Sequence, residues 1–144
     1  MFFMQETFFT SKEAAQITGC TLRQIQYWRE KGIVVPVISE TGTGRSIYYS
    51  RSNLVELAAL VYWLSTGISF DIACETLKQL KEEEPELFIS GQGKRFTLLL
   101  SQDDSLSLVE FDRKRAIASL DQGKSVIPVW LDIIYQGLAS KLLR

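Results

Sequence analysis

A short run of apolar and polar positions early in the chain lies between two signals that begin and end a helix. Thr10 and Glu13 have the Thr-x-x-Glu spacing of a capping box, and Gly19 is the kind of residue that follows a helix C-terminus. The pattern therefore predicts a short helix over Ser11–Thr18. The residues expected to face inward are Ala14, Ala15 and Ile17.

A second short helix is predicted after a brief turn. Thr21 and Gln24 repeat the capping-box spacing, and Gly32 is expected to end a helix over Leu22–Lys31. Two such helices in succession predict a helix-turn-helix. The narrow apolar stripe of the second helix consists of Leu22, Ile25 and Trp28 or Arg29.

The other faces of the second helix carry long hydrogen-bonding side chains. Such side chains at the start of a second helix are typical of an element in the major groove of DNA, where base edges and phosphates are both within reach. A polar surface helix without a nucleic-acid partner is the plainer alternative, but the caps and the turn length favour DNA binding. The side chains concerned are Arg23, Gln24, Gln26, Tyr27 and Lys31.

Two short β-rich runs follow, over Val34–Ile38 and Arg45–Ser50, on either side of a polar stretch that contains glycine. This pattern predicts a β-hairpin, or wing, whose tip can approach another surface closely. Arg45 and a tyrosine hydroxyl would contact phosphate. Because neighbouring residues of a strand point to opposite faces, one of Tyr48 and Tyr49 is expected in the core.

Two longer helices are predicted next. Ser52 is the expected cap of an apolar helix that ends at Gly67, and Ser69 is the expected cap of a helix that ends before Pro85. The inward positions are expected to be Leu54, Leu57, Ala58, Val61 and Leu64 on the first helix and Ile72, Leu77 and Leu80 on the second.

The last part of the chain changes pattern. Alternating apolar residues over 95–112 predict a β-hairpin with its turn at Gln102–Asp104. Asp112 is the expected cap of a helix that ends at Gly123. Pro128 is expected in the first turn of a final helix over Val129–Leu142.

That final helix would carry an apolar stripe that another surface must cover. Its own hairpin is one possible cover. We expect instead the same helix of a second chain, because two-fold homodimers are the commonest oligomers. The residues of this predicted dimer contact are Ile127, Trp130, Leu131, Ile134, Leu138 and Leu142.

Composition narrows the classes of function. Apolar residues make up 46% of the 144, histidine is missing, and Cys20 and Cys74 are the only cysteines. Without histidine, the usual general base and nearly all common zinc sites are removed, so we expect no enzyme, metal site or cofactor. We expect a cytoplasmic protein, because two isolated thiols suit a reducing compartment. We also expect a soluble protein with no membrane partner, because the sequence has no signal peptide and no apolar run of bilayer length.

Charge is unevenly distributed, although the net charge is only −1. From Phe9 to Arg51 there are six Lys and Arg against three Glu, whereas residues 82–144 carry eight positive and ten negative charges. A basic patch confined to one segment suits a modest DNA-contacting face. Arg113-Lys114-Arg115 lies apart and is interpreted as a solvated run, with a phosphate-bearing effector or Glu82–Glu84 as alternative partners.

The order of these elements over Phe8–Lys81 resembles the DNA-binding domain of MerR-type transcription regulators. The recognition-helix motif of that family, Leu-Arg-Tyr-Tyr-Glu-x-x-Gly-Leu, is matched by Ile25–Ile33 with the acidic residue displaced by one. Tyr49-Ser50 matches the end of the family's wing. Ser65–Ile72 matches its next helix turn.

Two departures from the family pattern concern arginine. Gln26 stands where the recognition helix usually has an arginine, and Ile47 stands where the wing usually has one. Arg45 lies two residues before Ile47 and therefore on the same face of a strand. These changes bear on the preferred DNA sequence more than on DNA binding itself.

The resemblance implies a mainly α fold with small β elements (α+β). The winged helix-turn-helix is predicted over residues 1–84. Residues 85–144 depart from the family pattern, and their own apolar pattern predicts a β-hairpin with helices and a C-terminal dimerisation helix. The resemblance also implies a homodimer on a near-palindromic promoter site, with RNA polymerase as a possible partner and no effector specified. The expected DNA contacts are Lys12, Thr21, Arg23, Gln24, Gln26, Tyr27, Lys31, Arg45, Tyr48 and Tyr49.

Two other functions fit the same pattern. An architectural, excisionase-like protein would use the winged helix to bend DNA without regulating polymerase. A protein–protein adaptor would keep the helix-turn-helix fold without DNA binding, in line with the slightly negative net charge. The positions of the bound DNA sites distinguish a regulator, which would bind in promoter spacers, from an architectural protein, which would bind at attachment sites or tandem arrays. Failure to bind any genomic fragment at low salt would favour the adaptor.

Overall fold

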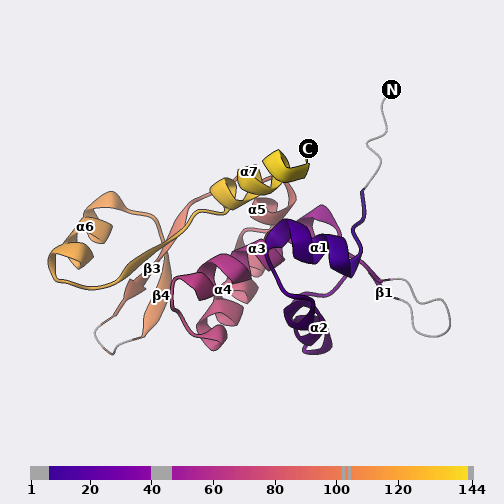
Figure 1. Cartoon of the computed structure of the whole chain (residues 1–144). Helices are drawn as coiled ribbons and strands as arrows, with labels where there is room; N and C mark the ends of the chain where they lie inside the picture. Colours follow the sequence, from indigo (N-terminus) through magenta and orange to yellow (C-terminus); the bar gives the residue numbers. More distant parts are fainter. Residues whose placement is uncertain (1–6, 40–46, 102, 104, 143–144) are drawn as a thin grey trace, which may run out of the picture.

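The computed structural model describes residues 7–39, 47–101, 103 and 105–142. Its elements are arranged as a helical body with a small sheet extending from one side (Figure 1). The helices are α1 (Ser11–Thr18), α2 (Leu22–Glu30), α3 (Arg51–Ser65), α4 (Phe70–Glu83), α5 (Glu86–Ile89), α6 (Arg113–Asp121) and α7 (Leu131–Leu142). The strands are β1 (Ile38–Ser39), β2 (Ile47–Tyr48), β3 (Phe96–Leu100), β4 (Leu106–Glu110) and β5 (Val126–Val129).

The caps of α1 and α2 are the two predicted capping boxes. The Thr10 hydroxyl accepts from the Glu13 N–H at 3.2 Å, and the Glu13 carboxylate accepts from the Thr10 N–H at 3.0 Å. Thr21 and Gln24 repeat this exchange at 3.0 Å in each direction. α2 ends at Glu30, one residue earlier than predicted, and Lys31 is its C-cap.

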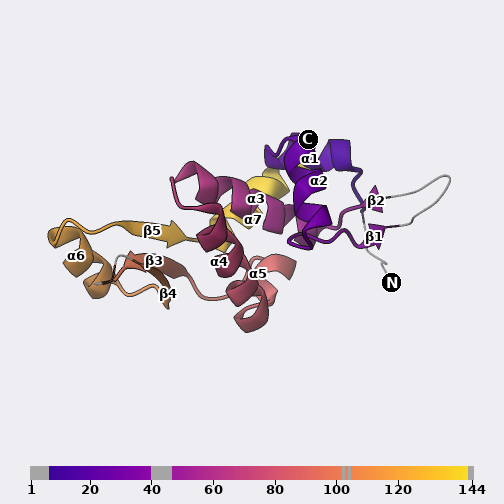
Figure 2. The ribbon, with the colours of Figure 1, turned by 90° about the horizontal axis from the view of Figure 1, so that it is seen from below.

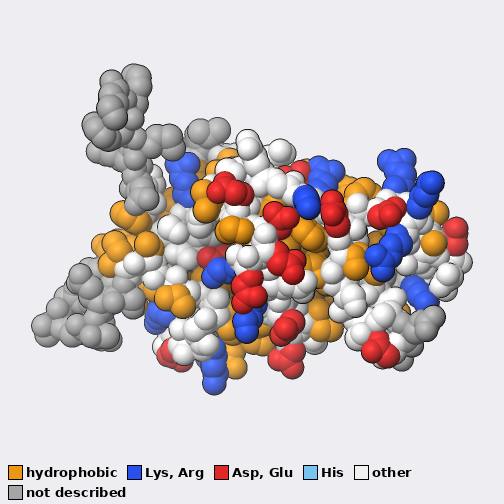
Figure 3. All heavy atoms as spheres, turned by 180° about the vertical axis from the view of Figure 1, so that it is seen from behind, with side chains coloured by type: hydrophobic (Ala, Val, Ile, Leu, Met, Phe, Trp, Pro, Cys, Tyr) orange, Lys and Arg blue, Asp and Glu red, His pale blue; other side chains and the backbone are white. Residues whose placement is uncertain are grey.

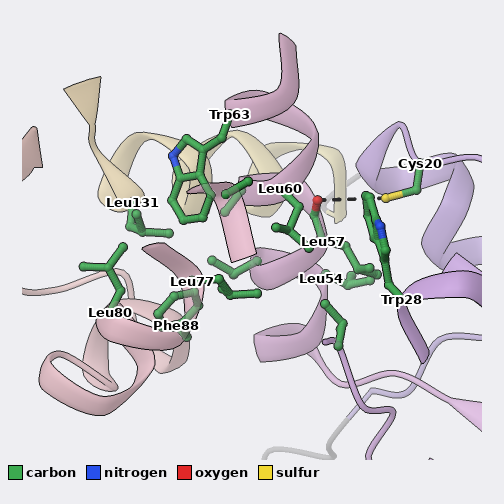
Figure 4. Close-up of a cluster of buried hydrophobic side chains, with 14 of the residues drawn as sticks. Cys20, Trp28, Leu54, Leu57, Leu60, Trp63, Leu77, Leu80, Phe88 and Leu131 are labelled. Carbon is green, nitrogen blue, oxygen red and sulfur yellow. Dashed lines mark hydrogen bonds between the residues drawn. The ribbon is translucent and has the colours of Figure 1, made fainter. Parts of the chain in front are cut away.

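α3 is the central helix of the body. α1, α4, α5 and α7 all pack against it, so its buried side chains lie around most of its circumference and not on one stripe. Figure 4 shows its residues meeting Leu77 and Leu80 of α4, Phe88 of α5 and Leu131 of α7. Its buried hydrophobic residues are Leu54, Val55, Leu57, Ala59, Leu60 and Trp63, whereas the predicted inward residues Ala58, Val61 and Leu64 are only half-buried.

The predicted cap of α3 was wrong by two residues. Ser50 is the N-cap: its hydroxyl accepts from the Asn53 N–H at 3.1 Å, and the Asn53 side-chain oxygen accepts from the Ser50 N–H at 3.0 Å. The helix therefore begins at Arg51, and Ser52 lies within its first turn. Ser69 caps α4 and Asp112 caps α6, as predicted.

The described strands form two antiparallel sheets. β1 pairs with β2, with Ile38 opposite Tyr48. The second sheet has the order β4-β3-β5, which Figure 2 shows extending away from the helical body. Phe96 and Leu98 belong to the same core as the helices, and α6 packs against β3 and β5. β3 is thus buried along most of its length.

The predicted start of the last helix was wrong. Val126–Val129 form β5, which pairs with β3 with Pro128 opposite Thr97, and α7 begins only at Leu131. Three β-branched residues in four favour a strand over a helix. β5 is an edge strand, and a proline is tolerated there because one side of the strand needs no N–H donor.

α7 packs largely within its own chain, and a contact of this helix with a second chain stays a prediction. It packs against α1, α3 and α5, and Leu131 and Leu138 are buried by these helices. Figure 1 shows α7 returning over α3 to lie beside α1, where the Lys141 Nζ donates to the Ile17 carbonyl at 3.1 Å. Ile127 lies in β5 and not on this helix.

An ion pair fixes the junction between the sheet and α7. The Arg95 guanidinium donates to the Asp132 carboxylate at 2.7 Å from Nη2 and at 3.1 Å from Nε, and it lies 4.2 Å from the centre of the Trp130 ring. Hydrogen bonding from Arg95 lowers the pKa of the Asp132 carboxyl. The start of α7 is therefore held to the start of β3.

No helix in the described parts of the chain is long and apolar enough to cross a bilayer.

Candidate nucleic-acid interface

α2 is held in place from beneath by two buried side chains. Ile25 and Trp28 are almost fully buried, as the sequence predicts. The Trp28 ring stacks on Phe70 of α4 at a centroid distance of 6.2 Å and an interplanar angle of 15°. α2 also packs against α1. The helix therefore has a fixed orientation before any partner binds.

The outer face of α2 is open to solvent. Arg23, Gln26, Tyr27 and Lys31 are all exposed, and α2 lies at the opposite side of the body from α7 (Figure 1). No carboxylate of the described residues lies within 4.0 Å of the Arg23 guanidinium. Gln26 donates to Glu30 at 3.2 Å, and the Lys31 ammonium lies 5.6 Å from the centre of the Tyr27 ring. These weak surface contacts can be exchanged for contacts with a partner.

Two predicted contact residues are partly committed to the helix cap. The Thr21 hydroxyl oxygen and the Gln24 carbonyl oxygen accept the two hydrogen bonds of the capping box. The Thr21 hydroxyl hydrogen and the Gln24 amide hydrogens remain available. Each side chain can therefore still donate to a phosphate or a base acceptor, but it has less freedom than Arg23.

Fewer of the predicted contact residues of the wing are exposed and described than the sequence predicts. Tyr48 is half-buried on β2, whereas Tyr49 is fully buried and forms a bridge with Phe9 through backbone hydrogen bonds of 2.9 and 2.8 Å. Tyr49 is therefore a core residue and not a DNA contact, because successive strand residues face opposite sides. Lys12 is exposed on α1. Arg45 lies outside the described residues.

Leu22 was predicted to be buried but is 53% exposed. It is the first residue of α2, directly after the N-cap Thr21. An exposed apolar side chain beside Arg23 suits contact with a thymine methyl group in the major groove. Its position directly after the N-cap was the signal that could have identified it.

The N-terminal half of the chain matches a known family. Residues 9–80 fit the family model described as MerR HTH family regulatory protein, which is half of the 144 residues. This chain belongs to the MerR family. The match covers α1 to most of α4 and confirms the resemblance predicted over Phe8–Lys81.

Relatives with this MerR domain include proteins named as HTH-type transcriptional regulators. Over 70 residues the chain is 39% identical to such a protein of Mycobacterium bovis and to one of Mycobacterium tuberculosis strain H37Rv. The matched segment covers 46% of this chain but only 31% of each relative. The chain thus matches less than a third of the length of these curated relatives.

In this MerR domain, a buried polar network supports the base of the wing. Glu56 is only 4% exposed, and its carboxylate lies 2.8 Å from the Lys81 ammonium. The Asn53 amide donates to Glu56 at 3.1 Å and to the Val35 carbonyl at 3.1 Å. Asn53 therefore joins the cap of α3, which follows β2, to the segment that precedes β1.

The pKa of Glu56 gives this network a pH dependence. Burial raises the pKa of the Glu56 carboxyl above its ordinary value of 4.5, and Lys81 and Asn53 lower it in part. The folded state therefore binds this proton more tightly than the unfolded state, and the contribution to stability is lost as pH rises from about 4.5 through the folded pKa.

We expect the difference in unfolding free energy between wild type and Glu56→Gln to change in that window. Urea denaturation at a series of pH values measures it, and a constant difference would contradict the assignment.

The two thiols of this MerR-family chain differ in accessibility. Burial raises the pKa of the Cys20 thiol to about 11, and its sulfur lies 3.9 Å from the Leu57 carbonyl (Figure 4). Cys74 is half-buried, and its pKa is raised mainly by burial and to a lesser extent by the charge of Asp71.

We expect a maleimide to modify Cys74 slowly and Cys20 only after unfolding, as measured by mass spectrometry with and without urea. Equal labelling rates in the folded protein would contradict this.

The basic run on α6 lies far from α2. Arg113, Lys114 and Arg115 are exposed, and Figure 3 shows Lys and Arg side chains, interspersed with Asp and Glu, at the end of the molecule formed by the sheet and α6. Within the described residues, none of the three forms an ion pair. The described residues also contain no group of three or more His, Cys, Asp or Glu side chains placed to hold a metal ion.

Proposed function

We propose that this MerR-family protein is a sequence-specific DNA-binding regulator of transcription that acts as a homodimer on a near-palindromic promoter site. The observation that supports this best is the outer face of α2. Its buried side is fixed by Ile25 and Trp28, while Arg23 and Gln26 remain exposed and unobstructed. A helix that is rigid on one side and polar on the other suits insertion into a major groove.

The contacts divide by chemistry. Arg23 and Gln26 can form paired hydrogen bonds with base edges, and Leu22 can contact a thymine methyl group. We assign Lys31 and Tyr48 to phosphate contacts, together with Arg45 as a prediction from sequence. This division assigns sequence preference to the start of α2 and overall affinity to its end and to the wing.

The homodimer and the near-palindromic site are proposed together from the membership of the chain in the MerR family, because a two-fold dimer matches the symmetry of such a site. Leu131 and Leu138 are buried within the chain, so a dimer contact of α7 would use the less buried residues of the predicted set, Trp130, Ile134 and Leu142. RNA polymerase would be a partner if binding changes the geometry of promoter DNA. An architectural role without polymerase would use the same interface.

Capture of genomic DNA fragments by the purified chain tests this function. We expect enrichment of short near-palindromic sequences in promoter spacers, and a mass of two chains on such a fragment by analytical ultracentrifugation. Enrichment at attachment sites or tandem arrays would favour the architectural function. Failure to bind any fragment at low salt would overturn DNA binding and favour the adaptor.

A further inference from the structure

A cleft next to the recognition helix has the size of a small-molecule site. It lies between the turn that follows α2 and the outer face of α4, and we call it the α2–α4 cleft. Its volume of about 410 Å³ falls within the range of roughly 300–1,000 Å³ typical of ligand sites. Its lining residues are Gly32, Ile33, Cys74, Leu77, Lys78, Lys81 and Glu82.

The lining combines an apolar wall with the ammonium groups of two lysines and the carboxylate of Glu82. Ile33, Cys74 and Leu77 supply apolar surface, while Lys78 and Lys81 lie three residues apart on one face of α4. No carboxylate of the described residues lies within 4.0 Å of the Lys78 ammonium. We propose that the α2–α4 cleft binds a small organic carboxylate, with its charge on Lys78 and its apolar part against Ile33 and Leu77.

Lys81 connects this cleft to the wing. Its ammonium is the ionic partner of Glu56, a nearly buried carboxylate, and Glu56 in turn accepts from Asn53, which holds the Val35 carbonyl. Because Lys78 and Lys81 line the same cleft from one face of α4, a carboxylate bound at Lys78 also competes with Glu56 for Lys81. Because a buried charge without its partner is costly, Glu56 and Asn53 must rearrange, and the base of the wing loses a fixed contact.

Occupation of the cleft therefore lowers the affinity of the protein for DNA. The coupling is reciprocal, so DNA lowers the affinity for the carboxylate by the same factor. This step rests on the proposed DNA-binding function, whereas binding of the carboxylate does not. A phosphate of the duplex is the other anion that could reach Lys78, but it would leave the apolar wall of the cleft unused.

The test uses the full chain and four probes, namely benzoate, phenylacetate, indole-3-acetate and octanoate, with benzamide as a neutral comparison. Binding is followed from amide chemical shifts of Gly32, Cys74 and Leu77 in ¹⁵N-labelled protein, at probe concentrations up to about 10 mM. We expect at least one carboxylate to bind, and benzamide to bind about tenfold more weakly or not at all. Lys78→Met should weaken binding about tenfold, and the matched variant Lys114→Met on α6 should leave it unchanged.

Coupling is measured separately as the loss of affinity for a captured DNA fragment at saturating carboxylate. We expect a loss of about fivefold or more in wild type and none in Glu56→Gln, which still binds the carboxylate. The proposal is overturned if no probe shifts the amides of the cleft, or if Lys78→Met and Lys114→Met bind alike. If no carboxylate binds to the wild type and Lys78→Met nevertheless lowers the affinity for DNA, Lys78 would instead be assigned to a phosphate of the duplex. If wild type binds no DNA, the proposed function fails while the chemical shifts still decide whether the cleft is a carboxylate site.

Discussion

Replacing Arg23 with alanine is expected to weaken binding to a captured operator fragment by about 10- to 100-fold, because a bidentate contact with a base contributes about 1–3 kcal/mol of discrimination. Arg23 is exposed at the start of α2, and no described carboxylate pairs with it. Its removal should also flatten the preference for operator over unrelated DNA. Fluorescence anisotropy on both fragments at several salt concentrations measures affinity and preference together.

Two variants serve as comparisons for Arg23→Ala. Arg113→Ala removes an exposed arginine of α6 and should change neither affinity nor preference. Arg45→Ala is expected from the sequence to weaken all fragments alike and to reduce the salt slope by about one, as for a phosphate contact. Equal losses on operator and unrelated DNA for Arg23→Ala would place its guanidinium on the backbone and remove it from base recognition.

Replacing Leu131 with alanine is expected to lower the free energy of unfolding by about 2–5 kcal/mol. Leu131 is fully buried where α7 packs against the helical body, so its truncation leaves a cavity that the neighbouring helices cannot fill. Ile133→Ala is the matched control on the same helix. Ile133 is 49% exposed, and its truncation should cost about 0.5 kcal/mol or less.

Urea denaturation followed by tryptophan fluorescence measures both variants. The difference in unfolding free energy between Leu131→Ala and Ile133→Ala should be the same at every protein concentration, because the contact lies within one chain. A difference that grows with protein concentration would support the contact between two chains that the sequence predicts for α7. Equal costs for the two variants would contradict the burial of Leu131 within one chain.

Local features of this chain were predicted well, because their partners lie three or four residues away. The capping boxes at Thr10 and Thr21, the cap at Ser69 and the inward positions Ile25 and Trp28 all follow from short-range geometry. The exposed residues of α2, including Arg23, follow from the same helical period. These elements also lie within the segment that matches the MerR family.

Features that depend on distant neighbours were predicted poorly. Val126–Val129 became a strand because β3 offers an open edge, although Pro128 suggested the start of a helix. Tyr49 became the buried tyrosine because Phe9, forty residues away in sequence, pairs with its backbone. Leu22 is 53% exposed although the helical period predicts it on the buried stripe, because period alone does not show how far the neighbouring elements extend along the helix.

The sequence by itself determined where most of the helices lie and which face of α2 is polar, since capping and periodicity act within a few residues. Only the tertiary structure decided that α7 covers α3, that Glu56 joins Lys81 to the wing through Asn53, and that a cleft lies between α2 and α4. An apolar stripe predicts that one face of a helix is buried, but it does not predict which other element covers that face. That choice depends on which long-range contacts bury the most apolar surface and leave no buried charge unpaired.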